Sequence, residues 1–272
     1  MTAGGDPATD GPRWPRSKAI YPTSLRRYQE CPHRVRLEYI DKVPIDPPAW
    51  DPVLEKGNAV HKIMETIGGH IRRNRPIPDY IRKRAEQLLP ASEYAFEALR
   101  QHDVEEVLGW SRSALRYLRR QPTRILVIEH YKPQKLTGEK FEKVQVGAKA
   151  DIVVRREDQH GPYIEIIDYK TGRNREFLTH TPLLSRIALR DIIKTELPGS
   201  KFPRSMFTYL WLASGEIDQI DLEQDYLLYQ WEEVCGQLED LLEETVWEPR
   251  PSPRCRWCPY YKRVCTPDLT GI

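Results

Sequence analysis

Two short segments place carboxylates and a lysine where they could bind a metal ion and cut a phosphodiester bond. Asp151 interrupts the mostly apolar segment Val146–Val153, and Asp168 and Lys170 lie two positions apart in Ile164–Gly172. Side chains two positions apart on a β-strand share a face. Buried charges are costly unless they are paired or bound to metal. Carboxylates from adjacent strands could therefore hold Mg²⁺ or Mn²⁺, beside a lysine that orients or deprotonates water.

Taken alone, the Asp168–Lys170 pair has an ordinary alternative. A D-x-K triplet at the end of a strand is more often a solvent-facing salt bridge than a catalytic pair, because short motifs occur by chance. Two further segments bear on this choice. His61 lies in Gly57–Glu65, a segment with helical spacing, and Glu129 interrupts an apolar segment of alternating period.

Together these segments resemble the PD-(D/E)xK nuclease superfamily, in particular its RecB-like exonuclease branch, which also contains the Cas4 proteins. Gly57–Glu65 matches the G-x-x-x-H-x-x-x-E helix of that branch, and Ile167–Gly172 matches its D-Y-K-T-G strand. The resemblance implies that His61, Asp151, Asp168 and the Tyr169 carbonyl bind Mg²⁺ or Mn²⁺. It also implies catalytic roles for Asp151, Asp168, Lys170 and Glu129.

One motif of the branch is altered. A Q-x-x-x-Y helix usually follows the D-x-K strand and helps to hold the DNA. The corresponding residues here are Ser205 and Tyr209, within a helix that we expect over 204–213. We expect both residues to contact DNA, with serine in place of the glutamine.

Four of the five cysteines have the spacing of a metal site. Cys255, Cys258 and Cys265 form a C-x2-C-x6-C pattern in the C-terminal segment 251–266, and Cys31 lies near the other end of the chain. Four thiolates suit a structural zinc ion and equally a [4Fe–4S] cluster, so their chemistry leaves the choice open. The resemblance favours the cluster, because several RecB-like nucleases join their N- and C-terminal regions with such a staple.

The elements that position these residues predict an α+β protein. Helical spacing covers 25–40, with a break at Pro32, then 53–73 and a helical insert over 79–121. Strands are predicted at 124–131, 143–155 and 163–169, joined as an antiparallel meander. Helices at 183–195 and 204–213, a strand near 219–228 and a helix over 231–246 follow. The resemblance implies a restriction-endonuclease-like core, a mixed sheet flanked by helices, in a single domain over 19–272 after a disordered tail at 1–18.

Composition sets the cellular context. The 272 residues carry a net charge of +2, with 39% hydrophobic and 30% charged residues, which describes a soluble globular protein. No apolar segment is long enough to span a bilayer, and the N-terminus has no secretory pattern, so a cytoplasmic protein without a membrane partner is expected.

The sequence therefore predicts a metal-dependent deoxyribonuclease that acts on single-stranded DNA or DNA ends in repair or recombination. A helicase or an integrase is a possible partner. A Cas4-like factor that trims DNA ends in CRISPR adaptation is the narrower alternative. A non-catalytic DNA-binding scaffold is the alternative from a different class, and the serine at 205 is the feature that favours it.

Overall fold

The computed structural model describes residues 11–15, 17–46, 50–136, 141–142, 144–172 and 180–269. The first ten residues of the predicted tail lie outside this part, whereas Trp14 is buried and donates a hydrogen bond to the carbonyl of Lys18. The chain divides into two compact units. The first unit comprises Met1–Pro47, Lys135–Val146 and Trp231–Ile272, and the second comprises Pro48–Gln134 and Gly147–Gln230. The single domain over 19–272 stays a prediction.

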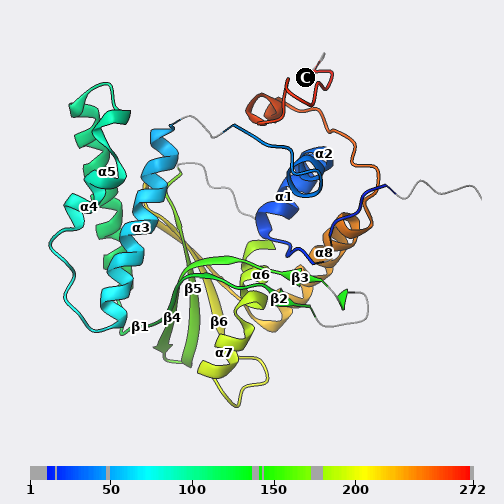
Figure 1. Cartoon of the computed structure of the whole chain (residues 1–272). Coiled ribbons are helices and arrows are strands. Elements are labelled where there is room, and N and C mark those ends of the chain that lie inside the picture. Colours follow the sequence, from blue (N-terminus) through cyan, green and yellow to red (C-terminus); the bar gives the residue numbers. More distant parts are fainter. Residues whose placement is uncertain are drawn as a thin grey trace, which may run out of the picture. The chain divides into compact units, whose positions relative to one another are not determined.

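The second unit is built on a mixed sheet in the order β1-β4-β5-β6-β7 (Figure 1). The predicted antiparallel meander is confirmed, because β4 pairs antiparallel with both β1 and β5. β6 runs parallel to β5, and β7 returns antiparallel to β6. The strands are β1 (Arg124–Tyr131), β4 (Lys149–Asp158), β5 (Gly161–Lys170), β6 (Ser205–Trp211) and β7 (Glu216–Asp221).

The prediction of a helix over 204–213 is wrong, since Ser205–Trp211 form β6, an inner strand between β5 and β7. Six of its seven side chains are buried, including Phe207, Tyr209 and Trp211. A strand buried on both faces is a continuous apolar run, and periodicity alone does not separate such a run from a buried helix. The elements after it are also displaced: β7 ends at Asp221, and α8 occupies Gln224–Glu243.

Two long helices pack against one face of this sheet. α3 (Pro52–Arg72) begins at Asp51, whose carboxylate accepts a hydrogen bond from the Val53 amide at 2.9 Å and so caps the helix. Val60 and Ile63 on its apolar side are buried in the hydrophobic core, where they join residues of α5 (Glu97–Leu118). The predicted insert consists of α5 with α4 (Ile81–Leu88) and a 3₁₀ turn at Ala91–Glu93.

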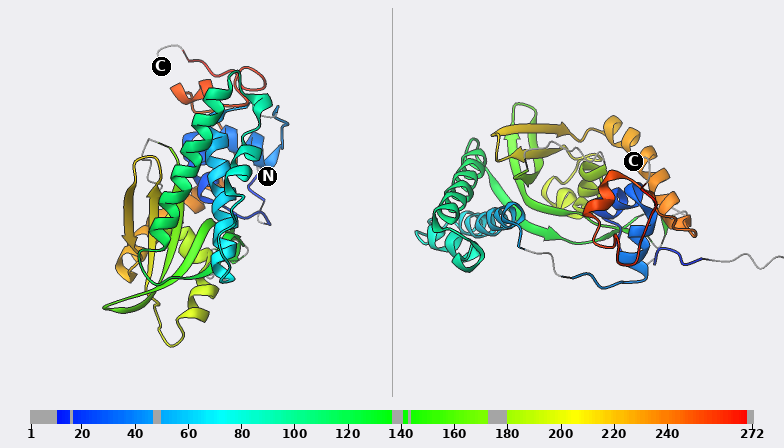
Figure 2. Two further views of the ribbon diagram at one scale, coloured as in Figure 1. Left: turned by 90° about the vertical axis from the view of Figure 1, so that its left-hand side faces the viewer. Right: turned by 90° about the horizontal axis from the view of Figure 1, so that it is seen from above.

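The parallel pairing of β5 with β6 needs a crossover, because the two strands run in the same direction. The described part of this crossover contains α6 (His180–Ala188) and α7 (Arg190–Glu196). These helices lie on the side of the sheet away from α3 and α5 (Figures 1 and 2). The sheet is therefore flanked by helices, as a restriction-endonuclease-like core requires.

The first unit joins the two ends of the described chain. α1 (Pro22–Glu30) stops at Cys31, and Pro32 opens α2 (Pro32–Val35), which continues as a π-helix (Arg36–Ile40), so the predicted break is confirmed. The Tyr28 hydroxyl donates a hydrogen bond to the Asp240 carbonyl of α8 at 3.0 Å. The unit also contains the strand pair β2 (Gln134–Lys135) and β3 (Gln145–Val146), and the 3₁₀ turn Pro253–Trp257.

None of the helices within the described ranges has both the length and the apolar composition that crossing a membrane would require.

Candidate metal centre and active site

Antiparallel pairing brings three acidic residues to the same end of the sheet. Glu129 lies near the end of β1, Asp151 near the start of β4 and Asp168 near the end of β5. The register pairs Ile128 with Ile152, and Ile152 with Ile167. Glu129 and Asp168 follow their paired residues and Asp151 precedes its own, so all three lie at the same edge. These carboxylates come together because neighbouring strands run in opposite directions.

His61 on α3 completes a group of side chains with metal-binding geometry. Its Nδ1 atom lies 3.1 Å from Asp151 Oδ1 and 3.6 Å from Glu129 Oε1. One ligand atom from each of these three residues lies within 4.8 Å of the other two. His61 Nδ1 is buried and makes no hydrogen bond with a described residue. Two oxygens and an unsatisfied buried nitrogen fit the donor set of a divalent cation.

Asp151 is the most enclosed of the three, with 3% of its surface exposed. Its other carboxylate oxygen accepts a hydrogen bond from the backbone amide of Tyr169 at 2.7 Å. This bond ties the start of β4 to the end of β5 and fixes the rotamer of Asp151. The Tyr169 carbonyl as a metal ligand stays a prediction.

Asp168 and Lys170 form an ion pair beside this group. Asp168 Oδ2 lies 2.5 Å from Lys170 Nζ, and the two side chains are 14% and 37% exposed. Lys170 Nζ also lies 5.7 Å from the centre of the Tyr209 ring. Asp168 is not among the three residues whose ligand atoms lie within 4.8 Å, so the predicted ligand set is only partly assembled.

The charges at this site shift one another's pKa values. Burial lowers the pKa of His61, but the carboxylates of Asp151 and Glu129 outweigh it and raise this pKa to about 9. Burial raises the pKa of Asp168 to about 6, with Asp151 adding to the rise and Lys170 opposing it. Without metal, the imidazolium of His61 therefore supplies positive charge to the site.

Sequence reasoning missed a second lysine. Lys149 Nζ lies 2.5 Å from Glu129 Oε2, and its ammonium group also feels the charges of Asp151 and Asp168. Lys149 precedes Asp151 by two positions on β4, so the rule that placed Asp168 and Lys170 on one face applies here as well. The site thus has a lysine on each of two adjacent strands.

The two residues predicted to contact DNA lie at different places. Tyr209 is opposite Asp168 in the β5–β6 register, whereas Ser205 pairs with Ile164, four positions earlier. Ser205 is 2% exposed and is not brought to the metal-binding group. The first described helix after β5 is α6, which contains no Q-x-x-x-Y pattern. The roles of Tyr209 and Ser205 stay predictions.

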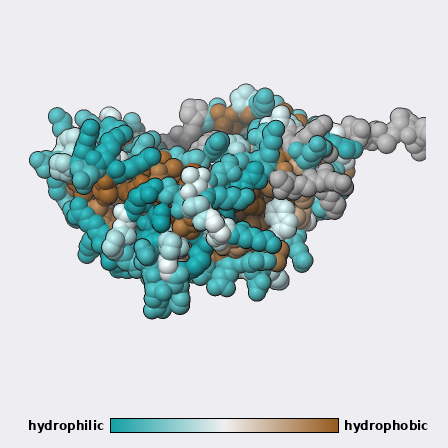
Figure 3. Space-filling view, turned by 90° about the horizontal axis from the view of Figure 1, so that it is seen from below, coloured by the Kyte–Doolittle hydropathy of each residue, from teal (hydrophilic) through white to brown (hydrophobic). Residues whose placement is uncertain are grey.

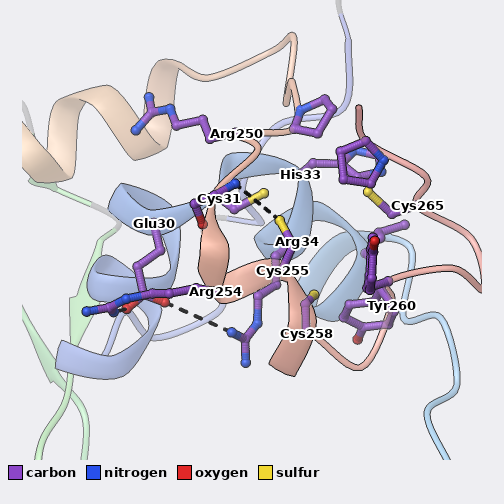
Figure 4. Close-up of a pocket in the computed structure, with 15 residues that line it drawn as sticks. Glu30, Cys31, His33, Arg34, Arg250, Arg254, Cys255, Cys258, Tyr260 and Cys265 are labelled. Carbon is purple, nitrogen blue, oxygen red and sulfur yellow. Dashed lines mark hydrogen bonds and ion pairs between the residues drawn. The ribbon is translucent and has the colours of Figure 1, made fainter. Parts of the chain in front are cut away.

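The four cysteines with metal-site spacing line one pocket of the first unit (Figure 4). Burial and the neighbouring Cys31, Cys258 and Cys255 raise the pKa of the Cys265 thiol. Within the described residues, no three of these sulfur atoms lie within 4.8 Å of one another. The pocket therefore gathers four thiols more loosely than a single bound ion would.

One other group within the described residues has metal-binding geometry: His102, Asp103 and Glu106 on α5. Lys56 Nζ lies 3.0 Å from Asp103 and 2.6 Å from Glu106 and forms an ion pair with each. This group serves to join α3 to α5.

Comparisons with known proteins agree with the fold. The sequence matches the PD-(D/E)XK nuclease superfamily over residues 20–266. A protein from Eubacterium rectale described as a candidate exonuclease shares 11% identity and a TM-score of 0.50, covering 93% of this chain and 91% of its own. SSO0001 shares 15% identity over 89% of this chain and 83% of its own, with a TM-score of 0.36. No curated protein matches significantly. Because the family match spans almost the whole chain, the protein belongs to the PD-(D/E)XK nuclease superfamily.

Proposed function

We propose that the protein is a metal-dependent DNA nuclease of the RecB-like branch that cuts single strands or DNA ends during repair or recombination. The observation that carries the proposal is the convergence of His61, Glu129 and Asp151 within 4.8 Å beside the Asp168–Lys170 pair. A structural scaffold has no need for so costly a group of partly buried charges.

His61, Glu129 and Asp151 would hold the metal, with Asp168 and the Tyr169 carbonyl as further oxygen ligands. When bound, Mg²⁺ or Mn²⁺ supplies Lewis acidity toward the phosphate and lowers the pKa of a water molecule. Lys170, which is ion-paired with Asp168, would donate hydrogen bonds that orient the attacking water and would offset charge on the phosphate. Lys149 would keep Glu129 ionised, since it and His61 both act to lower the pKa of that carboxyl group.

The donor set favours one of the two metals. An imidazole binds first-row transition metals well, whereas Mg²⁺ prefers oxygen ligands and retains its waters. We therefore propose that Mn²⁺ supports faster cleavage than Mg²⁺ at equal concentration.

The test is cleavage of end-labelled single- and double-stranded DNA with Mn²⁺ or Mg²⁺. Asp168→Asn and Lys170→Met should each lower the rate by roughly 100-fold or more, as losses of a preorganised charged group do. Asp158→Asn is the matched control, because Asp158 lies at the other end of β4 in an ion pair with Arg204. Equal rates in all four proteins would refute the proposal. Blocking the 5′ or the 3′ ends separates exonuclease from endonuclease action.

The partner is part of the same proposal. A RecB-like repair nuclease would work with a helicase, whereas a Cas4-like factor would work with an integrase. Stimulation of cleavage by one purified partner and not by the other distinguishes the two roles.

We also propose that Cys31, Cys255, Cys258 and Cys265 hold a [4Fe–4S] cluster. The four cysteines line one pocket, and burial together with the three neighbouring cysteines raises the pKa of Cys265, a rise that a bound cation would oppose. A tetrahedral zinc ion would draw thiolates to about 3.8 Å from one another, given Zn–S bonds of about 2.3 Å. No three of the described sulfurs lie within 4.8 Å of one another, so their spacing in this structure is not that of thiolates on one zinc ion.

Anaerobic purification followed by iron, sulfide and zinc analysis tests the cluster. We expect a brown protein with four iron atoms and four sulfides per chain, lost in Cys258→Ser and kept in Cys235→Ser. Cys235 lies on α8, outside the residues that line the pocket. Stoichiometric zinc without iron would refute the cluster.

A further inference from the structure

A second surface of the catalytic unit has the character of a phosphate-binding groove. An open hollow of about 540 Å³ lies between the C-terminal ends of α3 and α5 and the start of β1. Its lining contains no acidic residue. The lining residues are Ile71, Asn74, Arg75, Leu118, Arg119, Arg120, Gln121, Pro122, Thr123 and Ile125.

The arginines of this groove keep their charge available. Arg75, Arg119 and Arg120 are exposed, and within the described ranges none of them forms an ion pair; Arg120 stacks over the Tyr117 ring at 5.6 Å. Elsewhere in the same unit, surface arginines do pair with acids, as Arg82 pairs with Glu105. The positive charges of the three arginines that line this hollow repel one another, and a bound anion would offset that repulsion.

The backbone around the groove is fixed before any ligand binds. Asn74 ends α3 in the left-handed conformation, with φ of 52°, and donates its amide hydrogen to the Ile71 carbonyl at 2.9 Å. The Arg75 amide donates to the His70 carbonyl at 2.9 Å. The floor is apolar and rigid, because Leu118 and Ile125 are 3% and 5% exposed. Hydrophilic side chains cover most of the part that carries α3 and α5 in the view from below (Figure 3).

The groove and the metal-binding group share two elements. On β1, Ile125 in the groove precedes Glu129 by four residues, or about 13 Å. On α3, Ile71 follows His61 by ten residues, or about 15 Å. Phosphates along a stacked DNA strand rise by about 3.4 Å each, so these separations correspond to about four or five stacked nucleotides.

We propose that this groove binds the phosphate backbone of the nuclease's DNA substrate, about four or five nucleotides from the bond that is cut. The inference rests on the proposed DNA-cleaving function. Arginine forks bind phosphate oxygens in pairs of hydrogen bonds, and such contacts position a strand without reading its sequence. The groove would therefore set how much DNA must extend beyond the cut for tight binding.

The experiment compares two triple variants that lose the same three charges. The groove variant carries Arg75→Gln, Arg119→Gln and Arg120→Gln. The control variant carries Lys83→Gln, Arg84→Gln and Arg112→Gln, which lie on α4 and α5 and do not line the groove. Binding of a labelled single strand of about twelve nucleotides is measured in the presence of a chelator at several salt concentrations. Cleavage is measured on the same strand and on a shorter strand of about three nucleotides.

The groove variant should lower the slope of log affinity against log salt by about 2 to 3, since each lost phosphate contact removes about 0.7–0.9. Its KM for the long strand should rise at least tenfold, while kcat/KM for the short strand changes less than twofold. The control variant should match the wild type in slope and in KM.

Two results would overturn the proposal. One is a slope and a KM that are equal in the two variants. The other is a lower melting temperature of the groove variant with an unchanged slope, which would mean that the arginines only stabilise the helix C-termini. If the wild type cleaves neither strand, the proposed nuclease function fails, but the binding slopes still decide whether the groove binds the backbone.

Discussion

At the scale of single residues, Glu129 holds an unusual backbone conformation. Its φ of 50° lies in the left-handed region, which side chains other than asparagine, aspartate and glycine seldom adopt. Glu129 belongs to the group with metal-binding geometry and contacts both His61 and Lys149. Strain of this kind persists when the surrounding structure enforces it, and it commonly marks functional sites.

A pair of substitutions isolates this strain. Glu129→Gly and Glu129→Ala both remove the carboxylate, but only glycine adopts the left-handed region without cost. The glycine variant should therefore have the higher free energy of unfolding, by up to about 1 kcal/mol. At the exposed strand residue Glu157, the same pair should give the opposite order. Urea denaturation measures all four variants, and a more stable alanine variant at position 129 would contradict the strain.

His61 predicts how stability depends on pH in the metal-free protein. Its pKa is raised from 6.5 to about 9 in the folded state, so the folded protein holds a proton that the unfolded chain releases. The stabilisation is complete below pH 6.5 and is lost as pH rises to about 9. The loss should be about 3 kcal/mol, since one pKa unit corresponds to about 1.4 kcal/mol.

Urea unfolding in chelator across this pH range checks the prediction. His61→Gln should remove this part of the pH dependence, because glutamine does not titrate. An identical pH dependence in the wild type and in His61→Gln would show that His61 is not the group responsible.

At the scale of elements, a buried ionic network fastens α5 to the sheet. Arg156 of β4 lies 2.5 Å from Glu165 of β5, and the two residues are 4% and 0% exposed. Glu165 also accepts hydrogen bonds from the hydroxyl groups of Tyr117 on α5 and Thr208 on β6. The network lies three residues before Asp168 on β5, so it fixes the strands that carry the site.

Removing one partner of this network should be far more damaging than removing both. Glu165→Gln leaves the buried guanidinium of Arg156 without its counter-charge, and we expect a loss of about 3–5 kcal/mol in the free energy of unfolding. Glu165→Leu combined with Arg156→Met should lose much less than the sum of the single substitutions. In the exposed ion pair of Arg82 with Glu105, Arg82→Gln should lower the free energy of unfolding by at most about 1 kcal/mol. A double-mutant cycle by denaturant unfolding measures these differences, and additive effects would contradict the prediction.

At the scale of the whole molecule, each compact unit is assembled from segments that are distant in the sequence. The first unit combines the start of the chain, a short central segment and the C-terminal segment. Its cysteine-lined pocket includes Cys31 and three cysteines more than 200 residues later. Joining such distant segments costs chain entropy, and the binding free energy of a metal or a cluster held by all four would offset that cost.

Loss of the bound group should therefore destabilise the first unit. We expect Cys258→Ser to lower its melting temperature by about 5–10 °C, on the scale of 2–4 °C per kcal/mol for a chain of this size. Cys235→Ser is the control and should shift the temperature little. Thermal unfolding followed by circular dichroism makes the measurement. Equal melting temperatures in the two variants would mean that the pocket holds no stabilising group.

The sequence by itself determined which chemistry this protein could perform. The alternation of β5 places Asp168 and Lys170 on one face, and strand alternation is a local property of the chain. Only two residues separate β4 from β5, so the approach of Asp151 and Asp168 followed from local pattern, whereas β1 reaches β4 through a longer connection that contains β2 and β3. The break at Pro32 was predictable for the same reason, because proline acts on its own segment.

Tertiary structure decided the secondary structure and the side-chain contacts that depend on residues far apart in the sequence. Residues 205–211 became a strand because β5 offers a parallel edge, and their apolar run fits a buried helix equally well. That choice placed Tyr209 beside Lys170 and left Ser205 at the other end of β6. The pairing of β1 with β4 brought Lys149 into contact with the strained Glu129. Non-local pairing selects among conformations that the local sequence allows, and so it decided which of the possible side chains meet.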